Sequence, residues 1–136
     1  MKNLVITGLG AVTPIGIGVD NYWQGILDMK CGIEKITRFH DEDIPITIAG
    51  EVKDFDPKNY MSPKLTKETG TFIQFAYASA KEAIKQSNID IDSQPDRIGV
   101  VMATALSGTS QTPKEPTVLT GKRGLAPVFF PKFWAI

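Results

Sequence analysis

The stretch LVITGLGAVTPIG, residues 4–16, decides the fold class. Its first four residues form an unbroken β-favouring run that ends at a glycine, which is typical of a buried strand over 4–7. The glycines and the proline that follow predict a loop. A helix is then expected to begin at Asp20, whose carboxylate can cap free backbone N–H groups, and to end at Gly32. A strand, a glycine-rich loop and a helix in this order suggest the start of an α/β fold.

The rest of the chain continues this alternation. ITIAGEV, residues 46–52, predicts a second strand. The longest helix is expected to have Ser62 as its N-cap and a proline as its first residue, and to run through Ser87. Gly70 costs about 1 kcal/mol relative to alanine inside a helix, so the first turns are expected to be irregular. RIGVVMAT, residues 97–104, predicts a third, buried strand, which completes an α/β pattern.

The glycine-rich loop also invites a dinucleotide-binding interpretation. The pattern G-x-G-x-x-G begins at Gly8 but has Thr13 where the third glycine is required. No acidic residue ends a second strand about 20 residues further on. A tight strand-to-helix loop is therefore the favoured interpretation, and a free-standing nucleotide-binding α/β domain is kept as an alternative.

Composition excludes several classes of function. The chain has 136 residues, 42% of them hydrophobic and 22% charged, which is typical of one globular domain. Fifteen basic and fifteen acidic residues leave no net charge to hold nucleic acid or an anionic membrane surface. No apolar run approaches the ~20 residues of a membrane span. A single cysteine cannot form an internal disulfide, so a reducing cytoplasm is the expected location.

The one cysteine and the one histidine are the obvious candidates for chemistry. Cys31 is expected in the last turn of the first helix, where the negative end of the helix dipole disfavours a thiolate nucleophile. His40 lies in an acidic loop, and nothing in the sequence brings it to Cys31. We therefore predict a structural role for Cys31 and an exposed His40, with no metal site and no cofactor.

Several segments in fixed order carry a family resemblance. They are VITGLGAVTPIG from residue 5, a helix with Trp23, CGIEKITRF (31–39), IAGEVKDFDP (48–57) and DRIGVV (96–101). Together they resemble the N-terminal part of a β-ketoacyl-acyl carrier protein synthase, above all the elongating type II enzymes of fatty acid synthesis and their polyketide relatives. The resemblance runs from residue 3 to about 108, weakens, and returns at APVFFP (126–131).

The resemblance implies a thiolase-like layered α/β fold, present here as an incomplete N-terminal half, and a dimer in the family. The family's reaction is the decarboxylating Claisen condensation of an acyl thioester with malonyl-acyl carrier protein. Its nucleophilic cysteine and two catalytic histidines lie beyond the segments that match here, and Cys31 aligns with a position that is commonly serine. The chain is therefore expected to have no catalytic residue and to be inactive alone.

The resemblance also implies binding residues. Leu106 matches the residue that gates the acyl pocket, and Phe129 and Phe130 match residues that border it. Lys64, Lys67 and Arg123 fall at basic positions where relatives meet the acidic acyl carrier protein. Ordinary core packing for the phenylalanines and a solvated face for the basic residues are the simpler alternatives.

Residues 1–108 are thus expected to form the N-terminal part of a synthase domain. Residues 109–136 are expected to be a divergent, proline-rich apolar tail of the same domain. Besides acyl carrier protein, the expected partner is the remaining half of the synthase or a second subunit. The alternative function is a non-catalytic partner that binds carrier protein or completes a heteromeric enzyme.

Overall fold

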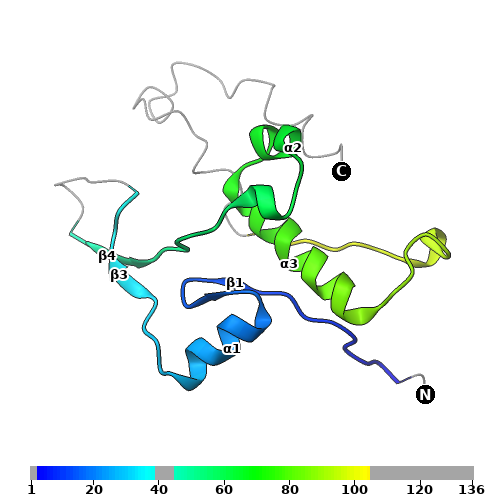
Figure 1. Cartoon of the computed structure of the whole chain (residues 1–136), viewed down its shortest axis with the longest axis horizontal. Coiled ribbons are helices and arrows are strands. Elements are labelled where there is room, and N and C mark those ends of the chain that lie inside the picture. The colour runs from blue at the N-terminus through cyan, green and yellow to red at the C-terminus, as the bar shows by residue number, and fades with distance from the viewer. Residues whose placement is uncertain (1–2, 39–44, 105–136) are drawn as a thin grey trace.

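A computed structural model describes residues 3–38 and 45–104 of the chain (Figure 1). Helix α3 (Thr71–Ser87) lies at the centre, and the hairpin of β1 (Val12–Thr13) and β2 (Gly16–Ile17) contacts it. The other elements are α1 (Val19–Leu27), β3 (Ile33–Lys35), β4 (Ile48–Gly50), α2 (Pro63–Glu68) and two 3-10 turns, Pro57–Asn59 and Pro95–Arg97. The described part is therefore α/β in content, with two small antiparallel sheets.

The glycine-rich loop contains a hairpin that the sequence did not predict. Val12 pairs with Ile17 and Thr13 with Gly16, around a two-residue turn. The Thr13 hydroxyl donates to the Gly16 carbonyl oxygen at 2.9 Å and also accepts from the Gly16 N–H at 3.1 Å. This side chain closes the turn, and strands of two residues leave no periodic pattern that could announce them.

Helix α1 begins and ends elsewhere than predicted. Its N-cap is Gly18, at φ +87°, and Asp20 lies inside the first turn instead of capping it. The helix ends at Leu27, five residues before Gly32, because Met29 adopts a left-handed φ of 52°.

The long predicted helix is two helices. The prediction of its start is confirmed, since the Ser62 hydroxyl accepts from the Leu65 N–H at 3.3 Å. The chain becomes extended at Thr69 and Gly70, so that α2 ends and Gly70 becomes the N-cap of α3. The irregularity expected from Gly70 is therefore a complete break. Helix α3 ends at Ser87, as predicted, with Asn88 in the left-handed conformation.

The prediction of buried strands over 4–7 and 97–104 is wrong for the described residues. Neither segment has a ladder partner there, and the second one begins with a 3-10 turn. Leu4 is 99% exposed and Val101 is 94% exposed. A strand needs a neighbour to accept and donate its backbone hydrogen bonds, and the described residues supply none. The strand predicted over 46–52 is confirmed only in its centre, where β4 pairs antiparallel with β3.

The core of the described part is small. Met61 and Ala78 are its buried hydrophobic residues. Beside them, Phe55 stacks on Tyr60 with ring centroids 5.3 Å apart and meets Phe75 edge to face at 4.9 Å. These contacts fix the segment before α2 to α3.

Candidate functional site

Most of the predicted binding residues lie outside the described part of the chain. These residues are Leu106, Arg123, Phe129 and Phe130. Lys64 and Lys67 are described. They are therefore the two predicted site residues whose surroundings the structure shows.

Both lysines lie on α2, and both are exposed. Neither ammonium group has a hydrogen-bond or ion-pair partner among residues 3–38 and 45–104. Lys67 is in the last helical turn, where a positive charge also complements the helix dipole. Two positive charges that have no ion-pair partner in the described part can meet an acidic partner without first breaking an ion pair there.

Side-chain bonds that the sequence did not reveal hold α2 in place. The Gln74 amide group donates to the carbonyl oxygens of Thr66 and Thr69, both at 3.0 Å. The Thr69 hydroxyl donates to the Leu65 carbonyl oxygen at 2.6 Å. Gln74 belongs to α3, so it satisfies carbonyl groups that the end of α2 leaves free and ties the lysine-bearing helix to its neighbour.

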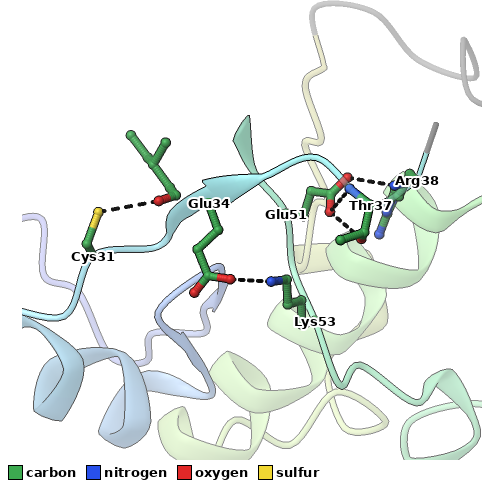
Figure 2. A network of polar contacts seen from close by, with 7 residues as sticks. Cys31, Glu34, Thr37, Arg38, Glu51 and Lys53 are labelled. Carbon is green, nitrogen blue, oxygen red and sulfur yellow. Dashed lines mark hydrogen bonds and ion pairs between the residues drawn. The ribbon is translucent and has the colours of Figure 1, made fainter. Parts of the chain in front are cut away.

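Cys31 lies in the loop between α1 and β3, not in the last turn of α1 as predicted. Cys31 is therefore outside the helix end at which the dipole was expected to disfavour a thiolate. Its thiol is exposed and lies 3.7 Å from the Ile33 carbonyl oxygen, and Figure 2 shows it apart from the neighbouring charged side chains. Among the described residues no His, Cys, Asp and Glu side chains group as metal ligands would, and His40 lies outside them.

A charged network closes the β3–β4 hairpin (Figure 2). Lys53 forms an ion pair with Glu34. The Glu51 carboxylate accepts from the Thr37 hydroxyl at 2.6 Å, from the Thr37 N–H at 3.0 Å and from the Arg38 N–H at 3.1 Å. These bonds join the two sides of the hairpin beyond its three paired residues, so the network is structural.

The same bonds shift the titration of the network. The hydrogen bond and charge of Lys53 lower the pKa of Glu34, and Glu34 in turn raises the pKa of Lys53. The Thr37 hydroxyl lowers the pKa of Glu51. Glu34 and Lys53 are exposed and Glu51 is only half-buried, so solvent screening limits what such pairs contribute to stability. The directions of the shifts fit carboxylates that are held ionised, unlike a general acid or base poised near neutrality.

The start of α1, where a dinucleotide-binding protein would hold a phosphate, is already occupied. The Val19 N–H donates to a carboxylate oxygen of Glu82 at 2.8 Å. An anionic ligand at this helix end would have to displace that side chain.

A hollow of 530 Å³ lies beside the β1–β2 hairpin and α1. Its lining combines apolar hairpin residues with polar side chains, which include Asn21, Gln24, Asp28, Glu34 and Lys53. A pocket for an acyl chain is lined predominantly by apolar groups. The described lining of this hollow therefore does not have the chemistry of the predicted acyl pocket.

No helix of the described part is long and apolar enough to cross a bilayer.

Known proteins resemble this chain over almost its whole length. Residues 1–130 match the family described as "Beta-ketoacyl synthase, N-terminal domain". The 3-oxoacyl-[acyl-carrier-protein] synthase 2 of Coxiella burnetii is 38% identical over 133 residues, which are 96% of this chain and 32% of that protein. The enzyme of the same name from Synechocystis is 38% identical over 89% of this chain and 29% of its own length. That from Staphylococcus aureus is 36% identical over 96% and 32%.

A solved structure adds a likeness in fold. The chain described as "The ishigamide ketosynthase/chain length factor" is 33% identical, with a TM-score of 0.58 over 65% of this chain and 22% of its own. The likeness indicates a thiolase-like fold for the part that aligns. This protein spans about a third of the length of the curated relatives it matches, as the 32% coverage of the first of them shows. With residues 1–130 matched to one family profile, the chain belongs to the β-ketoacyl synthase family, in the region of that family's N-terminal domain.

Proposed function

We propose that this chain is the N-terminal part of a β-ketoacyl-acyl carrier protein synthase that acts in fatty acid or polyketide synthesis. The observation that carries the proposal is the family match over residues 1–130, together with identities of 36–38% to 3-oxoacyl-[acyl-carrier-protein] synthases. In the reaction, an acyl group passes from carrier protein to an enzyme cysteine. Malonyl-carrier protein then loses CO₂, and the resulting carbanion attacks the acyl carbonyl and expels the thiolate.

The chain alone is proposed to be inactive. Its single cysteine lies exposed in a loop with no histidine beside it among the described residues, which is a poor setting for a nucleophile. Activation of a thiol requires an adjacent base or a cationic environment, and a carbanion intermediate requires positioned hydrogen-bond donors. The cysteine and histidines of the family would have to come from other parts of the enzyme.

Carrier-protein binding is proposed for Lys64 and Lys67, with Arg123 as a third contact. Their exposure, and the lack of an ion-pair partner among residues 3–38 and 45–104, support this role for the two lysines. Leu106, Phe129 and Phe130 remain the proposed acyl-pocket residues, on the resemblance alone.

Residues 1–108 are proposed to be an incomplete half of the thiolase-like domain, with 109–136 as its divergent tail. Segments 4–7 and 97–104 have no strand partner among the described residues. Their exposed apolar side chains support the proposal, because they would be buried if neighbouring strands were added. Those side chains are Leu4, Val5, Ile6, Val100, Val101 and Met102. The remaining part of the synthase or a second subunit is the proposed source of the missing strands.

A non-catalytic subunit is the second candidate. One observation favours it, because a solved structure that resembles this chain is described as a ketosynthase/chain length factor. A nucleotide-binding domain is disfavoured, because Glu82 occupies the start of α1. The DNA immediately downstream separates the two leading candidates. A continuation that encodes a cysteine at a strand-to-helix elbow supports the synthase, and an unrelated neighbouring gene supports the subunit.

An enzyme assay tests the proposal directly. The purified chain, incubated with acyl- and malonyl-carrier protein, is expected to form no ketoacyl product, and Cys31→Ala is expected to behave in the same way. Addition of a continuation encoded downstream is expected to restore condensation. Turnover by the chain alone that Cys31→Ala abolishes would overturn both the proposed inactivity and the alignment that makes Cys31 non-catalytic.

A further inference from the structure

Helix α1 begins without a cap of its own. Its N-cap is Gly18, which has no side chain, and the first N–H groups of any helix lack partners within that helix. The acceptor comes instead from α3, since an oxygen of Glu82 lies 2.8 Å from the Val19 nitrogen. The two residues are 63 positions apart in the sequence. The start of α1 therefore depends on another element for a bond that a local Ser or Asp would otherwise provide.

The second oxygen of the same carboxylate reaches the other side of the hairpin. It accepts from the Ala11 N–H at 3.0 Å, just before β1. Glu82 therefore holds both ends of the segment Ala11–Val19, which contains β1 and β2. Both bonds are charge-assisted and part-buried, a setting in which hydrogen bonds contribute more than at a free surface.

A neighbouring bond shows how the chain is placed along α3. The Gln86 side chain, one turn after Glu82, accepts from the Leu9 N–H at 2.6 Å. Four helical residues rise about 6 Å, and two extended residues advance about 6.6 Å, so the two spacings match. Gly8 and Gly10 allow the approach, because an added Cβ would lie 2.1 Å from the Ala83 oxygen and 1.8 Å from the Ser79 oxygen.

From this geometry we infer that Glu82 acts as a latch. The β1–β2 hairpin and the start of α1 stay folded only while its carboxylate, held on α3, accepts hydrogen bonds from Ala11 and Val19. A nine-residue helix and a hairpin with two residues per strand are too short to persist alone in water. Loss of the Glu82 carboxylate removes a hydrogen-bond acceptor from the hairpin and from the helix at once. The segment 11–19 should therefore open as a unit, while the bond of Gln86 to Leu9 remains. This inference does not depend on the proposed function.

Hydrogen exchange, resolved by residue on the full chain, tests the latch. In Glu82→Ala, the amides of Ala11 and Val19 are expected to exchange about tenfold to a hundredfold faster, as loss of a charged hydrogen-bond partner implies. The Leu9 amide and the amides in the middle of α3 are expected to keep their rates. Lys85→Ala is the control, because Lys85 also belongs to α3 but is exposed and forms no hydrogen bond to the described residues before α1.

A milder variant keeps the test decisive if Glu82→Ala does not fold. Glu82→Gln retains one acceptor oxygen and replaces the other by an NH₂ donor, so only one of the Ala11 and Val19 amides is expected to stay protected. Unchanged rates at both amides in the two variants would overturn the inference. An equal acceleration along the whole of α3 would also overturn it, because Glu82 would then contribute only to general stability.

Discussion

At the scale of single residues, the lysines of α2 offer the most direct test of partner binding. They are exposed and have no ion-pair partner in the described part of the chain. We predict that the double substitution Lys64→Glu and Lys67→Glu slows association with acyl carrier protein by about tenfold or more at low ionic strength, because it reverses charges that would steer an acidic partner. Surface plasmon resonance at two salt concentrations measures the effect.

Lys35→Glu is the control for this prediction. Lys35 is also exposed, but it is the last residue of β3 and does not belong to α2. Its reversal changes the net charge in the same direction, at half the magnitude. An equal loss of association with Lys35→Glu would mean that overall charge, and not α2, governs the encounter.

Glu51 gives a prediction about pH. Its pKa is lowered in the folded chain, chiefly by the Thr37 hydroxyl, so its stabilising bonds are fully present above the unfolded pKa and are lost as the pH falls through the lower, folded pKa. We therefore expect the amide proton resonances of Thr37 and Arg38 to move together below pH 4.5, the ordinary pKa of a glutamate. NMR titration measures this, and Glu51→Gln is expected to abolish it. Persistence of the transition in Glu51→Gln would assign it to another carboxylate.

Local sequence patterns predict the exposure of some of these residues but not the long-range hydrogen bonds of others. A surface lysine on a capped helix needs only local information, and the exposure predicted for Lys64 and Lys67 as the simpler alternative is what the structure has. Glu51 bonds to residues 13 and 14 positions away, and Glu82 to residues 63 and 71 positions away. Such roles depend on how elements meet, which no local pattern encodes.

At the scale of elements, the contact between the N-terminal segment and α3 can be tested with two glycines. An alanine at position 10 would place its Cβ 1.8 Å from the Ser79 oxygen, whereas nothing lies within 4 Å of the corresponding point at Gly99. We predict that Gly10→Ala lowers the free energy of unfolding by about 1–3 kcal/mol, the usual cost of overpacking. Denaturant unfolding measures the loss.

Gly99→Ala is the matched control for the same measurement. It is expected to change stability by no more than about 0.5 kcal/mol, as substitutions away from packed features usually do. Equal effects of the two alanines would mean that the N-terminal segment does not pack on α3 as described.

Elements with local signals are those that the sequence could predict. The N-cap at Ser62 and the helix end at Ser87 have local signals, and both boundaries are confirmed. The signal for the break between α2 and α3 is also local, because it is Gly70. The sequence predicted irregular first turns within one helix, whereas the structure has two separate helices. The segments 4–7 and 97–104 have strand-forming residues without a ladder, because strand formation depends on partners that the described residues do not include.

At the scale of the whole molecule, exposed apolar side chains are expected to determine whether the chain self-associates. Leu4, Ile6, Val100 and Val101 are between 80% and 99% exposed, and each large side chain left in water forgoes about 1.5–3 kcal/mol of burial. Unpaired extended segments also invite pairing with another chain. We predict that the purified chain self-associates in a concentration-dependent way, as measured by multi-angle light scattering.

The charge-bearing double variant Val5→Lys and Val101→Lys tests the cause of this association. It is expected to shift the chain toward monomer, because charged side chains protect exposed strand edges. A wild-type chain that stays monomeric at high concentration would contradict the prediction and would weaken the proposal of an incomplete half.

Family membership was predictable from the sequence, and the match over residues 1–130 confirms it. The layered architecture stays a prediction from that resemblance, since the described part contains two small antiparallel sheets and no layered sheet. A layered fold is a property of the complete set of strands.

The contacts among three aromatic rings, two in the segment before α2 and one on α3, provide an internal spectroscopic reporter. Phe55 lies face to face with Tyr60 and edge to face with Phe75, so circulating π-electrons of one ring shift the magnetic resonances of the next. Those resonances move to ordinary positions whenever the segment 55–60 leaves α3. The chain therefore carries its own unlabelled probe of whether the support for Lys64 and Lys67 is docked, and the probe can be read in the presence of any partner.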